Sequence, residues 1–464
     1  MMDSAPGGKS AVSIQGTAVV KPRRTFASVS VALFERFMPD ALILAIGLTS
    51  VVALASGLFA PQGTLTTIVT SWYAGVFAIL GFAFQMILIL VTGHALAHAP
   101  LVQRGLKRLV AGIMTPNQAV TVTFLTAAAA SWINWGFGLV IGAVLAREVA
   151  KQVRVDFAWL VAAAYSGFVI YASGPSGSIP LSQASAGNVL NIVEKVTGNI
   201  VPFSQSIFAA FNVAPTLLVL VVMPFVLIAV RPREHEMQVF VPPPEPPVVP
   251  PRTAATASIA RKIEASRAGS LFLVGAGIAY LAIAVSTSQI HVDINLVIFL
   301  FLIAGLALHG RPLNYADAVK SAARQTGTMM LQYPIYGGIM GIMTATGLAE
   351  VISRSVAAAA SAQTLPILSY VSSILISFVI PSGGGHWAVQ GPFTIPAAVA
   401  LNASIPATTM GVAMGEEVAN MLQPFWALPV VAIAGIGIQR VMGFTVLTFA
   451  VSAVIYGAAL LLLI

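Results

Sequence analysis

The fold is decided by residues 131–138, which read Ser-Trp-Ile-Asn-Trp-Gly-Phe-Gly at the centre of 109–146, a stretch of 38 residues without a charge. Basic residues flank this stretch at Arg108 and Arg147. Because basic residues collect on the cytoplasmic side of a membrane protein, both ends of the stretch are expected on that side. Its length would suit two thin spans or one hairpin. The polar and glycine residues at its centre favour a re-entrant hairpin, whose non-helical tip must be buried in protein or line a cavity.

The composition predicts a polytopic all-α membrane protein. Of the 464 residues, 58% are hydrophobic and 8% are charged, and the mean hydropathy is +0.91. A soluble domain carries about a quarter charged residues, so a soluble enzyme, a nucleic-acid binder and a disordered protein are excluded. Glycine and proline are scattered through the apolar stretches, which excludes a membrane β-barrel, because barrel strands alternate polar and apolar residues. The net charge of +8 does not require a nucleic-acid partner, because the basic residues of a membrane protein collect in its cytoplasmic loops. The chain has no cysteine, which excludes disulfides and cysteine-ligated zinc.

Hydropathy and basic clusters divide the chain into five parts, with the N-terminus in the cytoplasm and the C-terminus in the periplasm. Basic residues precede the first span, 38–60, and the last span is 443–464. The predicted parts are a disordered cytoplasmic tail (1–30), a first transmembrane repeat (31–230), a Pro-rich cytoplasmic linker (231–267), a connecting span (268–290) and a second repeat (291–464).

Both repeats read span, span, hairpin, broken span, span. The hairpins are 109–146, which opens from inside, and 364–403, which opens from outside, so the two halves are predicted to be inverted. The broken helices are 157–181 and 406–437. Discontinuous helices in corresponding positions of inverted repeats are typical of a secondary transporter with its site near the bilayer midplane. Close packing of glycine-rich helices is the competing interpretation.

A pair of carboxylates lies in the second broken helix. Glu416 and Glu417 are the only carboxylates between Glu350 and the C-terminus, and each charge at the bilayer centre costs about 2.5 to 3.5 kcal/mol. On a helix, Glu416, Asn420 and Gln423 would share one face. We predict that Glu416 or Glu417 binds H⁺ or Na⁺ and that the two amides bind substrate. The alternative is an interfacial helix start with its acidic residues near the positive end.

The hairpin tips offer neutral groups to an anion. Backbone N–H groups at the start of a half-helix attract negative charge. Because no Arg or Lys lies in these segments, a small monocarboxylate fits better than a dicarboxylate, which would want an arginine fork. Besides the two amides, the predicted substrate-binding residues are Ser131, Asn134, Trp135, Gly136, Ser173, Ser176, Ser382, Gly383, Gly384, Gly385 and His386.

His386 and the pair His94 and His98 each have a functional and a structural interpretation. His386 could relay protons or be a hydrogen-bonded structural imidazole. His94 and His98 have the i, i+4 spacing of metal ligands, but no third ligand is evident, so no metal site is predicted.

Several stretches resemble the bacterial short-chain fatty acid transporters linked to acetoacetate and butyrate catabolism. They are residues 38–41, 115–119, 131–138, 381–387, 391–392 and 415–420, and the resemblance covers roughly 31–464. It implies uptake of short-chain fatty acids at the inner membrane. It also implies membership of a wider ion-transporter group whose relatives use paired hairpins in an elevator-like motion. Some relatives have Ser-Asn-Thr at both tips. Here the tips read Ser-Trp-Ile-Asn from 131 and Ser-Gly-Gly from 382, so those Na⁺ sites do not carry over.

The predicted function is therefore symport of a short monocarboxylate with H⁺ or Na⁺, with no other cofactor. Residues 109–181 and 364–437 would form the transport domain, and the other spans would form a scaffold that could include a homodimer interface. The alternatives are a transporter of dicarboxylates or other small organic anions, a passive channel, and an intramembrane hydrolase. The hydrolase is disfavoured because Ser176, in Gly-Pro-Ser-Gly-Ser, does not fit the Gly-x-Ser-x-Gly nucleophile pattern.

Overall fold

The computed structural model describes residues 41–240, 259–264 and 266–464, and every regular element in these ranges is a helix. The all-α prediction is confirmed. The predicted disordered tail, 1–30, lies outside the described residues, as does 241–258 of the predicted Pro-rich linker. The described ends of that linker contain two short helices, η3 (Glu234–Glu236) and α12 (Ile259–Glu264).

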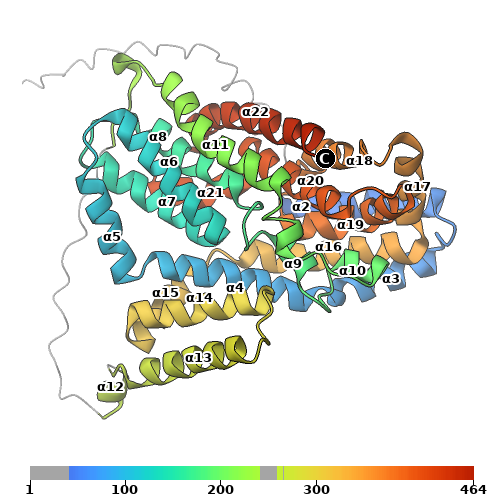
Figure 1. Ribbon diagram of the computed structural model, residues 1–464, viewed down its shortest axis with the longest axis horizontal. Helices are drawn as coiled ribbons and strands as arrows, with labels where there is room; N and C mark the ends of the chain where they lie inside the picture. Colours follow the sequence, from blue (N-terminus) through green and yellow to red (C-terminus); the bar gives the residue numbers. More distant parts are fainter. Residues whose placement is uncertain (1–40, 241–258, 265) are drawn as a thin grey trace, which may run out of the picture.

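The first half of the chain forms one apolar helix, a long apolar pair, a hairpin and a broken helix (Figure 1). Its elements are α2 (Ala41–Phe59), α3 (Leu65–Ala78), α4 (Leu80–Ala97), α5 (Pro100–Ala111), α6 (Pro116–Ile133), α7 (Trp135–Ala150), α8 (Phe157–Ser166), η1 (Gly167–Ile170), α9 (Ser178–Ala184), α10 (Ile192–Thr197), η2 (Phe203–Gln205) and α11 (Ala210–Ala229).

The second half has a similar order of elements after two additional helices (Figure 1). Its elements are α13 (Ala268–Ser286), α14 (Ile294–His309), α15 (Pro312–Ala323), α16 (Gly327–Thr346), α17 (Leu348–Ala359), α18 (Leu365–Ser377), α19 (Gly383–Ala400), α20 (Ile405–Ala419), η4 (Asn420–Leu422), α21 (Pro424–Ala434) and α22 (Ile438–Leu462).

Within the described ranges, five segments are long and apolar enough to cross a membrane: 42–59, 65–97, 210–229, 268–286 and 438–462. Two bent pairs raise the count to seven if each pair is one span. The bends measure 77° between α16 and α17 and 49° between the α20 end and α21. The bend after α16 falls at Gly347, whose φ of +82° suits glycine. The helix α16 therefore ends at Thr346, and α17 leaves it as an amphipathic helix.

Each hairpin turns at a short non-helical tip. Asn134 alone separates α6 from α7, with an extended backbone (φ −154°, ψ 122°). Residues 378–382 separate α18 from α19. Figure 1 shows the first hairpin toward one end of the molecule and the second toward the other. The recurring order agrees with two structural repeats, and their inversion about the membrane plane stays a prediction.

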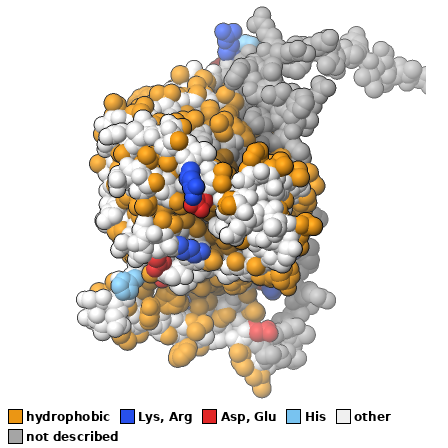
Figure 2. Space-filling view, turned by 90° about the vertical axis from the view of Figure 1, so that its right-hand side faces the viewer, with side chains coloured by type: hydrophobic (Ala, Val, Ile, Leu, Met, Phe, Trp, Pro, Cys, Tyr) orange, Lys and Arg blue, Asp and Glu red, His pale blue; other side chains and the backbone are white. Residues whose placement is uncertain are grey.

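The largest buried cluster surrounds the first hairpin and α8, and includes residues of α20 to α22. Around it, α3 packs along α16, and α11 packs along α22. By contrast, only Ser270, Gly277 and Ala284 of α13 are buried. The end-on face in Figure 2 mixes hydrophobic with other uncharged groups and shows few charged side chains.

Candidate functional site

The break after η1 is the centre of the candidate site. We call residues 171–178 the central segment. At its middle, the Ser173 carbonyl accepts a hydrogen bond from Trp132 Nε1 at 3.1 Å. The backbone N–H of Trp135 donates to Ser176 Oγ at 3.0 Å. The tip of the first hairpin is thereby attached to the central segment from both of its helices.

The tip of the second hairpin contacts the same segment. A Cβ on Gly383 would lie 2.9 Å from the Tyr171 hydroxyl, and one on Gly384 would lie 2.5 Å from the ring of Phe82. A Cβ on Gly385 would lie 2.3 Å from the ring of Tyr336. The three glycines therefore allow close approach to aromatic rings, which no residue with a Cβ could match without movement. At the N-cap of α19, Ser382 hydrogen-bonds Tyr333.

Glu417 anchors α20 to the central segment. One carboxylate oxygen accepts the backbone N–H groups of Ala172 and Ser173, at 2.8 and 3.1 Å. The other accepts Ser173 Oγ at 2.9 Å. Tyr456 of α22 hydrogen-bonds the same carboxylate. Its partners are donors and none is charged, so Glu417 is held by dipoles alone.

Glu416 is held by side chains. The Tyr171 hydroxyl donates to one of its oxygens, and Asn420 Nδ2 donates to the other at 3.0 Å. Both glutamates are fully buried. None of the salt bridges within the described ranges involves either of them. The structure thus places two adjacent carboxylates among neutral groups.

Two predicted residues, Asn134 and His386, use their polar groups within the fold. Asn134 caps α7 through Phe137 N at 2.9 Å and donates to the Ile89 carbonyl of α4 at 3.3 Å. Ser131 packs against Gly138 inside its own hairpin, and its hydroxyl has no hydrogen-bond partner among the described residues. His386 contacts Ser373, Ser377 and Gln390, which matches the structural-imidazole interpretation.

Gln423 does not extend the face formed by Glu416 and Asn420. The helix tightens into η4 at 420–422, and Gln423 then has an extended backbone (ψ 137°). Its Nε2 donates to the Ser377 carbonyl of α18. The sequence pattern placed these three residues on one helical face, and the structure places only the first two together. Gly136, also a predicted site residue, packs tightly against Leu90 of α4.

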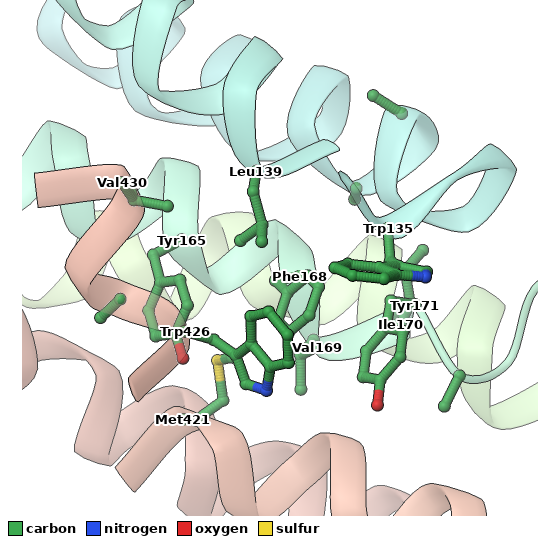
Figure 3. Packing of buried hydrophobic residues seen from close by; sticks show 14 of the residues in the cluster. Trp135, Leu139, Tyr165, Phe168, Val169, Ile170, Tyr171, Met421, Trp426 and Val430 are labelled. Atoms are coloured by element: carbon green, nitrogen blue, oxygen red, sulfur yellow. The ribbon is translucent and has the colours of Figure 1, made fainter. Parts of the chain in front are cut away.

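Figure 3 shows an aromatic cluster in which only Trp135 was a predicted site residue, and Trp426, Phe168 and Tyr171 were not. Trp426 lies edge-on to Trp135, with ring centroids 5.3 Å apart, and contacts Phe168, which stacks on Tyr171 at 4.4 Å. The indole N–H groups of Trp135 and Trp426 have no hydrogen-bond partner among the described residues. Tryptophans in apolar runs are typical of the membrane interface, so their presence is only a weak signal for this cluster.

The described residues contain no group of three or more His, Cys, Asp or Glu side chains that could hold a metal. What the arrangement offers is two buried carboxylates, two unpaired N–H donors and aromatic walls. These groups could accept a cation and contact a small anion with an apolar part.

The fold and this buried polar centre define a polytopic helical membrane protein of transporter architecture. Two solved structures share the fold: the YdaH transporter of Alcanivorax borkumensis, described as having an unusual topology, and MtrF of Neisseria gonorrhoeae, assigned to a class of antimetabolite efflux pumps. The TM-scores are 0.56 and 0.57 at 16% and 14% identity, over 90% and 94% of this chain and 98% and 97% of theirs.

The chain belongs to the short-chain fatty acid transporter family, whose model matches residues 23–463. It is 40% identical over 437 residues to a protein of Escherichia coli (strain K12) and 37% identical over 433 residues to one of Haemophilus influenzae. Each match covers 91% of this chain and 96% of the relative. Both relatives are provisionally named short-chain fatty acid transporters. The protein is therefore a multi-pass inner-membrane transporter and not an enzyme.

Proposed function

We propose that the protein is a secondary active transporter that moves short-chain fatty acids of the acetoacetate and butyrate class together with H⁺ or Na⁺. The observation on which this proposal depends is the pair of buried carboxylates with neutral partners only. Burying a charge without a compensating opposite charge is costly. A proton or Na⁺ would remove that cost, so occupancy of the pair would depend on the cation gradient.

The two glutamates are suited to different parts of this cycle. Glu417 accepts two backbone N–H groups, at 2.8 and 3.1 Å, which fix its position. Glu416 is bound by the side chains of Tyr171 and Asn420, and these can rotate away. We assign cation exchange to Glu416 and anchoring of the central segment to Glu417.

The substrate carboxylate has suitable partners close by. A carboxylate only accepts hydrogen bonds, and the Trp135 and Trp426 indoles each have an unpaired N–H group. Either N–H group could donate to one substrate carboxylate, and in Figure 3 the two indole nitrogens point in different directions. The rings themselves would contact a short alkyl tail. Contact with an apolar tail favours a monocarboxylate over a dicarboxylate.

An elevator-like motion is supported by the way the pieces are joined. Both hairpin tips and α20 contact the central segment, which links them into one group. Ser173 also binds Asn212 of α11, at 3.2 Å, and Tyr456 of α22, at 3.3 Å. We therefore include α11 and α22 in the moving group and assign α2 to α5 and α13 to α17 to the scaffold. Binding of both ligands would shift an existing equilibrium between inward and outward states.

The test is uptake of labelled butyrate into proteoliposomes under an imposed pH or Na⁺ gradient, with a panel of C2 to C6 acids and succinate as competitors. Glu416→Gln is expected to lower coupled uptake at least about tenfold, a change of about 1.4 kcal/mol. Glu417→Gln is expected to lower it as well. Glu350→Gln is the matched control, because Glu350 is exposed and paired with Arg354. Normal uptake in both single variants and in the double variant would contradict the proposal.

A further inference from the structure

A cavity of about 390 Å³ lies between the proposed moving group and the proposed scaffold. One side is formed by α7 and α21, and the other by α4 and by residues 324–329, where α15 is joined to α16. Its volume falls in the range of small-molecule sites, about 300–1,000 Å³. Because its walls come from both groups, the cavity would change shape when one group moves against the other.

The polar part of the cavity contains a cation. Arg324, Gln325 and Thr328 line it, and Arg324 and Thr328 are exposed. The Arg324 side chain forms no salt bridge or hydrogen bond with the described residues, and its backbone N–H donates to the Ala322 carbonyl. Gln325 is fixed by a hydrogen bond with His94 of α4. A guanidinium presents several N–H donors in a geometry that matches a carboxylate.

The apolar part is deeper. Leu139, Val140 and Met329 line it and are 4%, 2% and 5% exposed. Phe425 and Trp426 complete this wall. An open cationic part and a buried aliphatic part are the two chemical features of a short-chain fatty acid anion.

Trp426 separates the cavity from the buried carboxylates. Its ring contacts Phe168, and Phe168 stacks on Tyr171, whose hydroxyl donates to Glu416. In Figure 3 the indole nitrogen of Trp426 points away from Leu139, on the side where the Tyr171 hydroxyl lies. One layer of aromatic rings thus divides the cavity from the centre of the candidate site.

We propose that this cavity is the entry site for the short-chain monocarboxylate from the cytoplasmic side, and therefore the site it leaves from during uptake. The substrate carboxylate binds Arg324, its alkyl tail contacts Leu139, Val140 and Met329, and Trp426 is the barrier it passes to reach the carboxylate pair. This inference rests on the proposed function. It adds a substrate-contacting arginine that lies outside both hairpins and both broken helices.

The first test is the concentration dependence of butyrate transport when the acid is supplied on the cytoplasmic side, in inside-out membrane vesicles. Arg324→Gln is expected to raise KM about tenfold and to change kcat less than about twofold, because the entry site is lost while the translocating group is intact. Arg324→Lys keeps the charge but loses the planar fork, so an intermediate KM is expected. Arg354→Gln is the matched control, since Arg354 is exposed on α17 and is not a cavity residue. An unchanged KM in Arg324→Gln would overturn the proposal.

The second test measures binding without transport. The chain has no cysteine, so Thr328→Cys introduces a single thiol at the cavity. Butyrate is expected to slow its labelling by a maleimide at least about threefold, and the neutral analogue butyramide is expected to leave it unchanged. Ser355→Cys, exposed on α17, is the control whose labelling should not respond. Equal protection by butyrate and butyramide, or none by butyrate, would overturn the entry site.

The two proposals fail in different ways. If the unmodified protein takes up no butyrate under any gradient, the proposed function fails, and protection of Thr328→Cys still decides whether the cavity binds the acid. If the unmodified protein takes up butyrate while KM and labelling are insensitive to these changes, only the entry site fails.

Discussion

At the level of single residues, three carboxylates are fully buried in the described part of the chain, and their partners differ. Asp156 accepts Arg440 Nη2 at 2.8 Å and Gln238 N at 2.9 Å on one oxygen. Its other oxygen caps α8 through Trp159 N, at 2.9 Å. Glu416 and Glu417 have no such cation. Asp156 therefore has a cation partner inside the fold, whereas in the proposed cycle the glutamate pair takes its cation from solution.

This contrast predicts the effect of Asp156→Asn on stability. The amide oxygen can still cap α8. The NH₂ group then replaces the carboxylate oxygen that accepts from Gln238 and Arg440, and it can accept from neither, and the negative charge is lost. Removing one partner of a buried ion pair costs about 3–5 kcal/mol. Because the Arg440 side chain is 32% exposed, we expect about 2 kcal/mol and a lower apparent melting temperature in detergent.

The matched change is Asp317→Asn. Asp317 pairs with Lys320 at 3.1 Å, but both side chains are more than two-thirds exposed, and such pairs contribute about 0–1 kcal/mol. Its melting temperature should be close to that of the unmodified protein. Equal losses in the two variants would show that burial of Asp156 is not what makes its ion pair important.

At the level of elements, α3 and α16 can cross closely because the residues at their contact are glycines, which have no side chain. A Cβ on Gly337 would lie 2.4 Å from the Gly75 carbonyl oxygen, and one on Gly75 would lie 2.3 Å from the Gly337 carbonyl oxygen. One turn further along α16, a Cβ on Gly341 would lie 2.4 Å from the Ser71 carbonyl oxygen. Small residues at this spacing let two membrane helices approach closely.

Gly337→Ala is therefore expected to destabilise the protein by about 1–3 kcal/mol, because the blocking atoms are backbone and the helices must separate. Gly81→Ala in α4 is the control, since a Cβ there meets nothing within 4 Å. Helix propensity alone favours alanine over glycine by up to about 1 kcal/mol. The melting temperature should fall in the first variant and stay equal or rise in the second. The same sign in both would contradict the role of this crossing.

The breaks in the helices could be predicted from the sequence, because glycine, proline and asparagine act on the local backbone. Asn134 stands at the first tip, and Gly174 and Pro175 stand in the central segment. The contacts between distant segments could not be predicted. Ser173 and Glu417 are 244 residues apart in the sequence, and no periodic pattern links them. From the sequence around them, Trp426 would be predicted to lie at the membrane interface and Arg324 to be one of several basic residues in a cytoplasmic loop. Only the three-dimensional structure shows that both line the same cavity.

At the level of the whole molecule, the repeated order of elements places two amphipathic helices in corresponding positions. The helix α5 follows α4, and α17 follows α16. In Figure 1 they lie at opposite ends of the molecule. The basic residues Arg104, Lys107 and Arg108 on α5 put that end in the cytoplasm by the positive-inside rule. If the halves are inverted, α17 then lies on the periplasmic side, despite Arg354.

Single cysteines in this cysteine-free chain test that arrangement. Lys107 and Ser355 are both exposed, so each thiol should react with a maleimide. With a membrane-impermeant reagent on intact cells, Ser355→Cys should be labelled and Lys107→Cys should be protected until the membrane is permeabilised. Arg354 stays paired with Glu350 in this design, so the charge that departs from the positive-inside rule is kept. Labelling of both cysteines from the same side would contradict the inverted repeat. An elevator-like motion based on two inverted halves would then have no structural basis, although the carboxylate pair and the cavity would remain.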